Sequence, residues 1–128
     1  MQKITIFSRI ILFLLYFQTL FFKFTASEES VFIFSQLKME PYGRIFTGIS
    51  ELGICILLIF SSTYIYASVL SIFVISGAIL SHLFILGIEI KEDGGLLFFL
   101  AILIFILSVS NLILNKDKLI EEFEKWRK

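Results

Sequence analysis

The stretch from Glu51 to Glu89, ELGICILLIFSSTYIYASVLSIFVISGAILSHLFILGIE, decides the fold of this chain. Its 37 internal residues include no Asp, Glu, Lys or Arg. A helix of about 20 apolar residues crosses a lipid bilayer, so this run is long enough to cross twice. The polar break at residues 61–64, SSTY, falls inside the run and predicts a tight turn between two antiparallel membrane helices.

The composition of the whole chain also indicates a membrane protein. Of its 128 residues 58% are hydrophobic, and the mean hydropathy is +0.95. Soluble domains contain about 45–50% apolar residues, and a soluble domain of this composition would expose apolar patches larger than water tolerates. Basic and acidic residues number 11 each, so the chain lacks the basic surface of a nucleic-acid-binding protein. The lipid bilayer is its expected partner.

The single cysteine, Cys55, lies in the middle of an apolar segment. One thiol cannot form a dithiol pair, which argues against a thiol–disulfide enzyme of the vitamin K epoxide reductase kind. No neighbouring residue would stabilise a thiolate, so we interpret Cys55 as a packing residue. The chain has one histidine and scattered carboxylates, and therefore no metal motif.

Four apolar segments of span length are expected at about residues 4–24, 44–60, 65–88 and 94–114. They predict an all-α fold, an integral membrane four-helix bundle over residues 1–114, followed by a tail over residues 115–128. The first segment is about 20 residues long and contains Arg9, whereas a signal-peptide core has about 7–15 apolar residues. We therefore expect it to remain as a span.

Two further helices are expected outside the spans. Thr25 and Glu28 have capping-box spacing, and Pro41 closes the segment that follows. Residues 25–42 therefore predict a short interfacial helix between spans one and two, with an irregular loop as the alternative. One face of the tail is apolar and predicts an amphipathic helix along the headgroups, or else a frayed helix end. That face consists of Leu119, Ile120, Phe123 and Trp126.

The distribution of Lys and Arg predicts the orientation of the four spans. The side that holds both termini and the second loop has seven basic residues, and the side with the first and third loops has four. By the positive-inside rule, both the N- and C-termini of this multi-pass protein are expected to be cytoplasmic.

Three segments carry small or polar residues along one helical stripe, which is typical of helix–helix contacts in membranes. The stripes are Arg44, Thr47, Glu51, Cys55, Leu58 and Ser62; then Ala67, Ser71, Val74, Ala78, Ser81, His82 and Glu89; then Ala101, Ile104, Ser108, Asn111 and Asn115. We expect all three to face the bundle interior. In the first segment Arg9, Tyr16, Leu20 and Lys23 share a face opposite Gln18, and the sequence leaves open which face is buried.

Charged residues and histidines within spans are expected to face the interior or a partner. Glu51 and His82 lie at similar depths on adjacent antiparallel helices, which predicts a buried polar pair. Lys23 and Arg44 lie near the same rim, and either could neutralise Glu51. Three interpretations of the pair stay open: a purely structural contact, a ligand or quinone site, and proton transfer.

Residues 37–52, LKMEPYGRIFTGISEL, resemble the stretch that enters the second helix of DoxX-like membrane proteins, with its arginine, glycine and Gly-x-x-Glu-Leu. Residues 76–83, SGAILSHL, resemble the third-helix pattern of that family, a Gly-Ala run that leads to Ser-His. Arg9 and Lys23 also fit, and the resemblance covers about residues 6–114.

The resemblance implies a small four-helix protein of the bacterial inner membrane. Some members resemble the membrane subunit of a thiosulfate:quinone oxidoreductase, and others work beside soluble redox or sulfur-transfer partners. It also implies that Arg44, Glu51 and His82 line a site. The chain shows no redox cofactor of its own, so a bound quinone or a partner subunit would supply electrons.

Two alternatives to a redox subunit are a small transporter and a structural subunit of a larger membrane complex. The first span contains no acidic residue, so the mechanism of small multidrug exporters, which use a glutamate there, does not transfer. The sequence leaves a homo-oligomer open.

Overall fold

The computed structural model describes residues 2–90 and 93–127, which form helices joined by short turns and loops. The elements in chain order are α1 (Gln2–Phe24), α2 (Glu28–Gln36), α3 (Tyr42–Ile59), α4 (Tyr64–Ser81), the π-helical turn η1 (His82–Leu86), α5 (Leu96–Leu114) and α6 (Lys116–Arg127). Within the described residues, four helices are long and apolar enough to cross a membrane: α1, α3, α4 continued by η1, and α5. The predicted all-α membrane bundle is confirmed, and its span ends lie within two residues of those expected.

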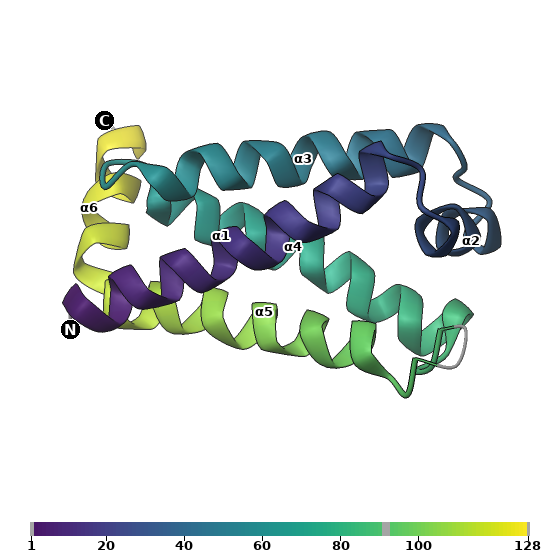
Figure 1. Ribbon diagram of the computed structural model, residues 1–128. Helices are drawn as coiled ribbons and strands as arrows, with labels where there is room; N and C mark the ends of the chain where they lie inside the picture. The colour runs from purple at the N-terminus through teal and green to yellow at the C-terminus, as the bar shows by residue number, and fades with distance from the viewer. Residues whose placement is uncertain (1, 91–92, 128) are drawn as a thin grey trace.

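The four spans run alternately up and down, so the two ends of the bundle differ (Figure 1). One end, here called the terminal end, carries the N-terminus, the α3–α4 turn and α6. The other, the α2 end, carries α2 and the loop between η1 and α5. In this view α1 and α4 cross, so that toward the α2 end α1 lies with α3, α4 lies with α5, and the two pairs diverge. This divergence shapes the candidate site.

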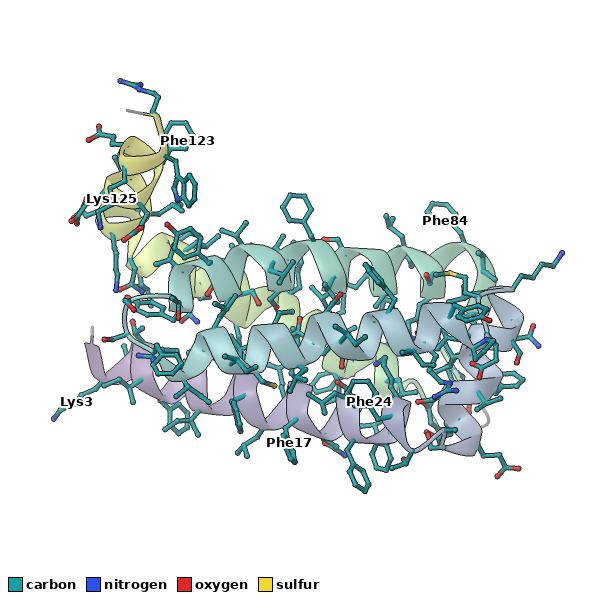
Figure 2. The ribbon with its side chains drawn as sticks, turned by 90° about the horizontal axis from the view of Figure 1, so that it is seen from above. Lys3, Phe17, Phe24, Phe84, Phe123 and Lys125 are labelled. Carbon is teal, nitrogen blue, oxygen red and sulfur yellow. The ribbon has the colours of Figure 1, made fainter. Side chains whose placement is uncertain are left out.

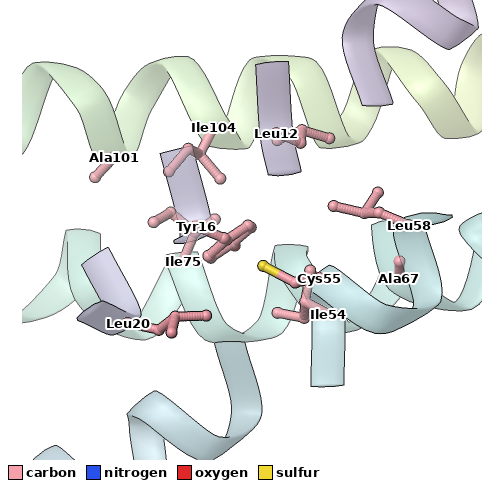
Figure 3. Packing of buried hydrophobic residues seen from close by; sticks show 10 residues of the cluster. All are labelled: Leu12, Tyr16, Leu20, Ile54, Cys55, Leu58, Ala67, Ile75, Ala101 and Ile104. Carbon is pink, nitrogen blue, oxygen red and sulfur yellow. The ribbon is translucent and has the colours of Figure 1, made fainter. Parts of the chain in front are cut away.

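The core is a narrow column of side chains between the four spans (Figure 3). The face of α1 that carries Leu12, Tyr16 and Leu20 is buried and Gln18 is exposed, which answers the question that the sequence left open. The remaining buried members are Ile54, Cys55, Leu58, Ala67, Ile75, Ala101 and Ile104. Lipid is as apolar as these side chains, so their contribution to stability comes mainly from close packing between helices.

Most of the predicted stripe residues face this core. The buried ones are Arg44, Glu51, Cys55, Leu58, Ala67, Ser71, His82, Ala101, Ile104, Ser108 and Asn111. Two predictions are wrong, because Ser62 and Glu89 are exposed. Both lie beyond the ends of the helices, where the helical period no longer determines which way a side chain faces. Large apolar side chains such as Phe17 and Phe84 point outward from the bundle (Figure 2).

The helix expected between spans one and two is α2, which packs on α3, α1 and η1. The predicted capping role of Thr25 is wrong: Ser27 is the N-cap and accepts a 3.3 Å hydrogen bond from the Ser30 N–H. Thr25 instead donates to the Phe21 carbonyl at 2.8 Å, because the last turn of α1 extends this far. Pro41 does not close α2 but directly precedes α3.

The tail forms the expected amphipathic helix, α6, which turns away from the long axis of the bundle (Figure 2). Its exposed apolar face, with Phe123 and Trp126, fits the headgroup layer of a membrane. Two hydrogen bonds hold α6 against α4. The Tyr66 hydroxyl donates to the Glu122 carboxylate at 2.6 Å, and the Trp126 indole N–H donates to the Tyr66 hydroxyl at 2.8 Å.

Acidification is expected to release α6 from α4. The hydrogen bond from Tyr66 holds the pKa of Glu122 below its ordinary value, against a smaller opposite effect of burial. Such a group stabilises the contact above its unfolded-state pKa, and the stabilisation is lost as the pH falls through the lowered folded-state pKa. Trp126 is the only tryptophan, so its fluorescence should change as the pH falls below the ordinary pKa range of a glutamate carboxyl group. Tyr66→Phe should show the released emission already at neutral pH. Wild-type emission that stays constant through acidification would contradict the prediction.

Candidate functional site

A cavity of about 440 Å³ lies where the helix pairs diverge at the α2 end. Side chains of α1, α2, α3, α4, η1 and α5 line it, and most of them are apolar. The polar exceptions on opposite sides include Lys23 and Glu51 from the α1–α3 pair and His82 from η1. A mainly apolar cavity with a few convergent polar groups is the usual form of a small-molecule site.

Glu51 is buried, with 4% of its surface exposed, and its carboxylate has two partners from α1. The Lys23 ammonium lies 2.7 Å from one oxygen, and the Thr19 hydroxyl donates to the other. Of the two cations expected to neutralise Glu51, Lys23 does so. A carboxylate is stable inside a membrane protein when it is paired and hydrogen-bonded in this way.

Arg44 is buried, and its partners are Glu40 and the backbone of Lys23 rather than Glu51. Its Nε lies 2.9 and 3.0 Å from the two carboxylate oxygens of Glu40, and its Nη1 donates to the Lys23 carbonyl. Arg44 and Glu51 are seven positions apart, which is about 10 Å along α3, whereas Glu40 is one turn away. Arg44 contacts the backbone of Lys23 and is not among the residues that line the cavity, and its binding role stays a prediction.

His82 is buried at the start of the π-helical turn η1. Its Nδ1 lies 2.9 Å from the Gly87 carbonyl oxygen, and since a carbonyl only accepts, Nδ1 carries the proton. In the neutral tautomer that carries this proton, Nε2 is an acceptor. Gly87 has φ +81°, a conformation that favours glycine, and this turn directs its carbonyl back toward the ring. The edge of the ring packs on Phe98, with centroids 5.5 Å apart.

The predicted direct pairing of Glu51 with His82 is wrong in the described part of the chain. Both side chains line the same cavity, yet Glu51 bonds to α1 and His82 to its own turn. The physical reason is the divergence of the helix pairs, which places the cavity between these walls. π-helical turns occur often at functional sites, and His82 occupies one here.

Sequence reasoning did not single out Thr19, which completes the coordination of Glu51. The sequence contained a signal for Thr19, because Thr19 and Lys23 are four residues apart and so share one face of α1. It also missed the contact between Tyr16 and Ser71, whose hydroxyl oxygens lie 2.6 Å apart beside the cavity. That contact joins α1 to α4, and no periodicity within one helix reveals it.

Comparisons with known proteins return no match to this chain: no family model matches it, and neither curated proteins nor solved structures give a significant hit.

Proposed function

We propose that this multi-pass protein is a DoxX-like protein of the bacterial inner membrane that binds a quinone in the α2-end cavity. It would serve there as an accessory subunit beside a soluble or membrane redox partner. The single observation that carries the proposal is the cavity itself, whose walls are mainly apolar and whose polar lining includes Lys23, Glu51 and His82. The excess of Lys and Arg at the terminal end supports cytoplasmic termini and a cavity toward the outer leaflet.

The residues present fit a quinone head group, which is a flat apolar ring with carbonyl acceptors. The Lys23 ammonium uses one donor on Glu51 and has others for a carbonyl oxygen. His82 faces the cavity with an acceptor nitrogen that can take or return a proton. A volume of about 440 Å³ lies within the range of small-molecule sites. When bound, a quinone supplies two-electron, two-proton redox chemistry, and the partner subunit supplies or removes the electrons.

Purified wild-type protein is expected to retain quinone through detergent extraction, and Glu51→Gln and His82→Ala are expected to lose it. Gln abolishes the ion pair that holds Lys23, and Ala removes the acceptor nitrogen. A lost hydrogen bond to a charged group costs about 1.5–3 kcal/mol, which corresponds to a weakening of Kd by at least about tenfold. Solvent extraction and chromatography of the purified proteins measure the retained quinone.

Phe84→Ala is the matched control for this experiment. Phe84 lies in the same turn as His82 but is 79% exposed and is not among the residues that line the cavity. The control should retain quinone at the wild-type level. If both site variants also retain it and only lower thermal stability, then the polar groups are structural and the protein is a scaffold subunit. Proton-coupled uptake of a solute that depends on the same residues would favour the transporter alternative.

A further inference from the structure

Buried polar side chains continue from the cavity to the terminal end through the middle of the bundle. The Tyr16 and Ser71 hydroxyl oxygens lie 2.6 Å apart, and those of Ser71 and Ser108 lie 2.7 Å apart. These three residues are at most 1% exposed and come from α1, α4 and α5. A hydroxyl both donates and accepts, so the three can pass a proton along by exchanging their hydrogen bonds.

Two unpartnered polar groups follow this hydroxyl chain toward the terminal end. Both Asn111 side-chain atoms, Nδ2 and Oδ1, have no hydrogen-bond partner among the described residues, and Asn111 is 0% exposed. The hydroxyl of Ser8, which is 6% exposed, also has none. Leaving a buried polar group unsatisfied is costly, and a bound internal water is the usual remedy.

The positions of Ser8 and Asn111 place them opposite one another. At the next turn toward the terminal end, the Asn115 Nδ2 donates to the Thr5 hydroxyl at 3.2 Å. Thr5 is three residues before Ser8 on α1, and Asn115 is four residues after Asn111 on α5, so the next facing positions are Ser8 and Asn111. Ser108 lies one turn from Asn111 toward the α2 end, and it is the first of the three linked hydroxyl groups. A water bound at this level would bridge the two halves of the polar column.

The column reaches the surface at both ends. At the terminal end the Tyr64 hydroxyl donates to Asn115 at 2.9 Å, and the cations Arg9 and Lys118 lie over the Tyr64 ring. At the α2 end Tyr16 and Glu51 both line the cavity. Glu51 is ion-paired with Lys23, whose side chain is 15% exposed.

We propose that this column is a proton path across the membrane, completed by internal water at Asn111 and Ser8 and by water in the cavity. A proton that enters at the terminal end passes from hydroxyl to hydroxyl to Glu51 and leaves through Lys23 at the α2 end. Each group releases one proton as it takes up another, so no group changes its charge after one passage. The path uses none of the quinone chemistry proposed above.

The test is proton entry into vesicles that contain the purified full-length protein and no quinone. A potassium diffusion potential drives the flux, and an entrapped pH dye reports it. We expect uptake well above that of empty vesicles, and loss of the excess in Ser71→Ala and in Asn111→Leu. The first change removes the link between Tyr16 and Ser108, and the second removes the amide that binds water.

Ser68→Ala is the matched control. Ser68 is on the same helix as Ser71 and is 0% exposed, but its hydroxyl donates within α4 to the Tyr64 carbonyl. This variant should conduct as the wild type does, and circular dichroism verifies that each variant is folded. Wild-type uptake equal to that of empty vesicles overturns the path without any variant. Uptake that persists in a folded Ser71→Ala or Asn111→Leu protein, or that is also lost in Ser68→Ala, overturns it too. Loss of quinone retention with intact flux would instead refute only the proposed function.

Discussion

Replacing Lys23 with methionine is expected to lower the free energy of unfolding by about 3 kcal/mol, because it leaves the Glu51 carboxylate buried without its cation. The two charged groups lie 2.7 Å apart, and the Glu51 side chain is 5% exposed. Breaking a buried ion pair costs about 3–5 kcal/mol. We expect the low end of that range because the Thr19 hydroxyl still donates to the carboxylate. Helical circular dichroism during titration with a denaturing detergent measures the change.

Lys3→Met is the matched control for this change, since it makes the same substitution at an exposed position of the same helix. It should leave the unfolding midpoint unchanged. The double variant Lys23→Met with Glu51→Leu should recover much of the lost stability, because it removes both charges together. Equal unfolding midpoints for Lys23→Met and the wild type would show that the ion pair contributes nothing to the fold.

Replacing Arg9 with leucine is expected to destabilise the terminal end of the bundle by about 2–3 kcal/mol, the amount that one or two hydrogen bonds from a charged group contribute. The Arg9 Nη2 donates to the Leu58 carbonyl at 2.7 Å and to the Ile59 carbonyl at 3.0 Å. These carbonyls belong to the last turn of α3, where no helical N–H is available to them. The guanidinium also lies 4.7 Å from the centre of the Tyr64 ring, so it joins α1, α3 and α4.

Two further variants test whether the Arg9 guanidinium is responsible for the predicted stability. Arg9→Lys retains the charge but loses the planar fork, so we expect it to recover only part of the stability. Arg127→Leu removes an exposed arginine from α6 and should leave the unfolding midpoint unchanged. The same detergent titration measures all three variants. An Arg9→Leu protein as stable as the wild type would mean that water or lipid satisfies the α3 carbonyls equally well.

The number and the approximate ends of the spans were predictable from the sequence because hydropathy alone specifies them. Lipid cannot hydrogen-bond to a backbone, so each apolar segment of span length must form a helix. The stripes were also predictable for α5, where Ala101, Ile104, Ser108 and Asn111 all face the interior. The pattern failed at Ser62 and Glu89, which lie just beyond helices. Helical periodicity does not predict which side chains are buried beyond the ends of the helix.

The sequence by itself determined that the chain is a bundle of four membrane helices with polar groups inside, because burial in lipid depends on composition and helical spacing. The tertiary structure alone decided how those groups pair: Glu51 with Lys23 and Thr19, Arg44 with Glu40, and His82 with Gly87. Those partners depend on how the helices cross and diverge. The divergence of the helix pairs leaves Glu51 and His82 lining one cavity without the direct contact that the sequence predicted.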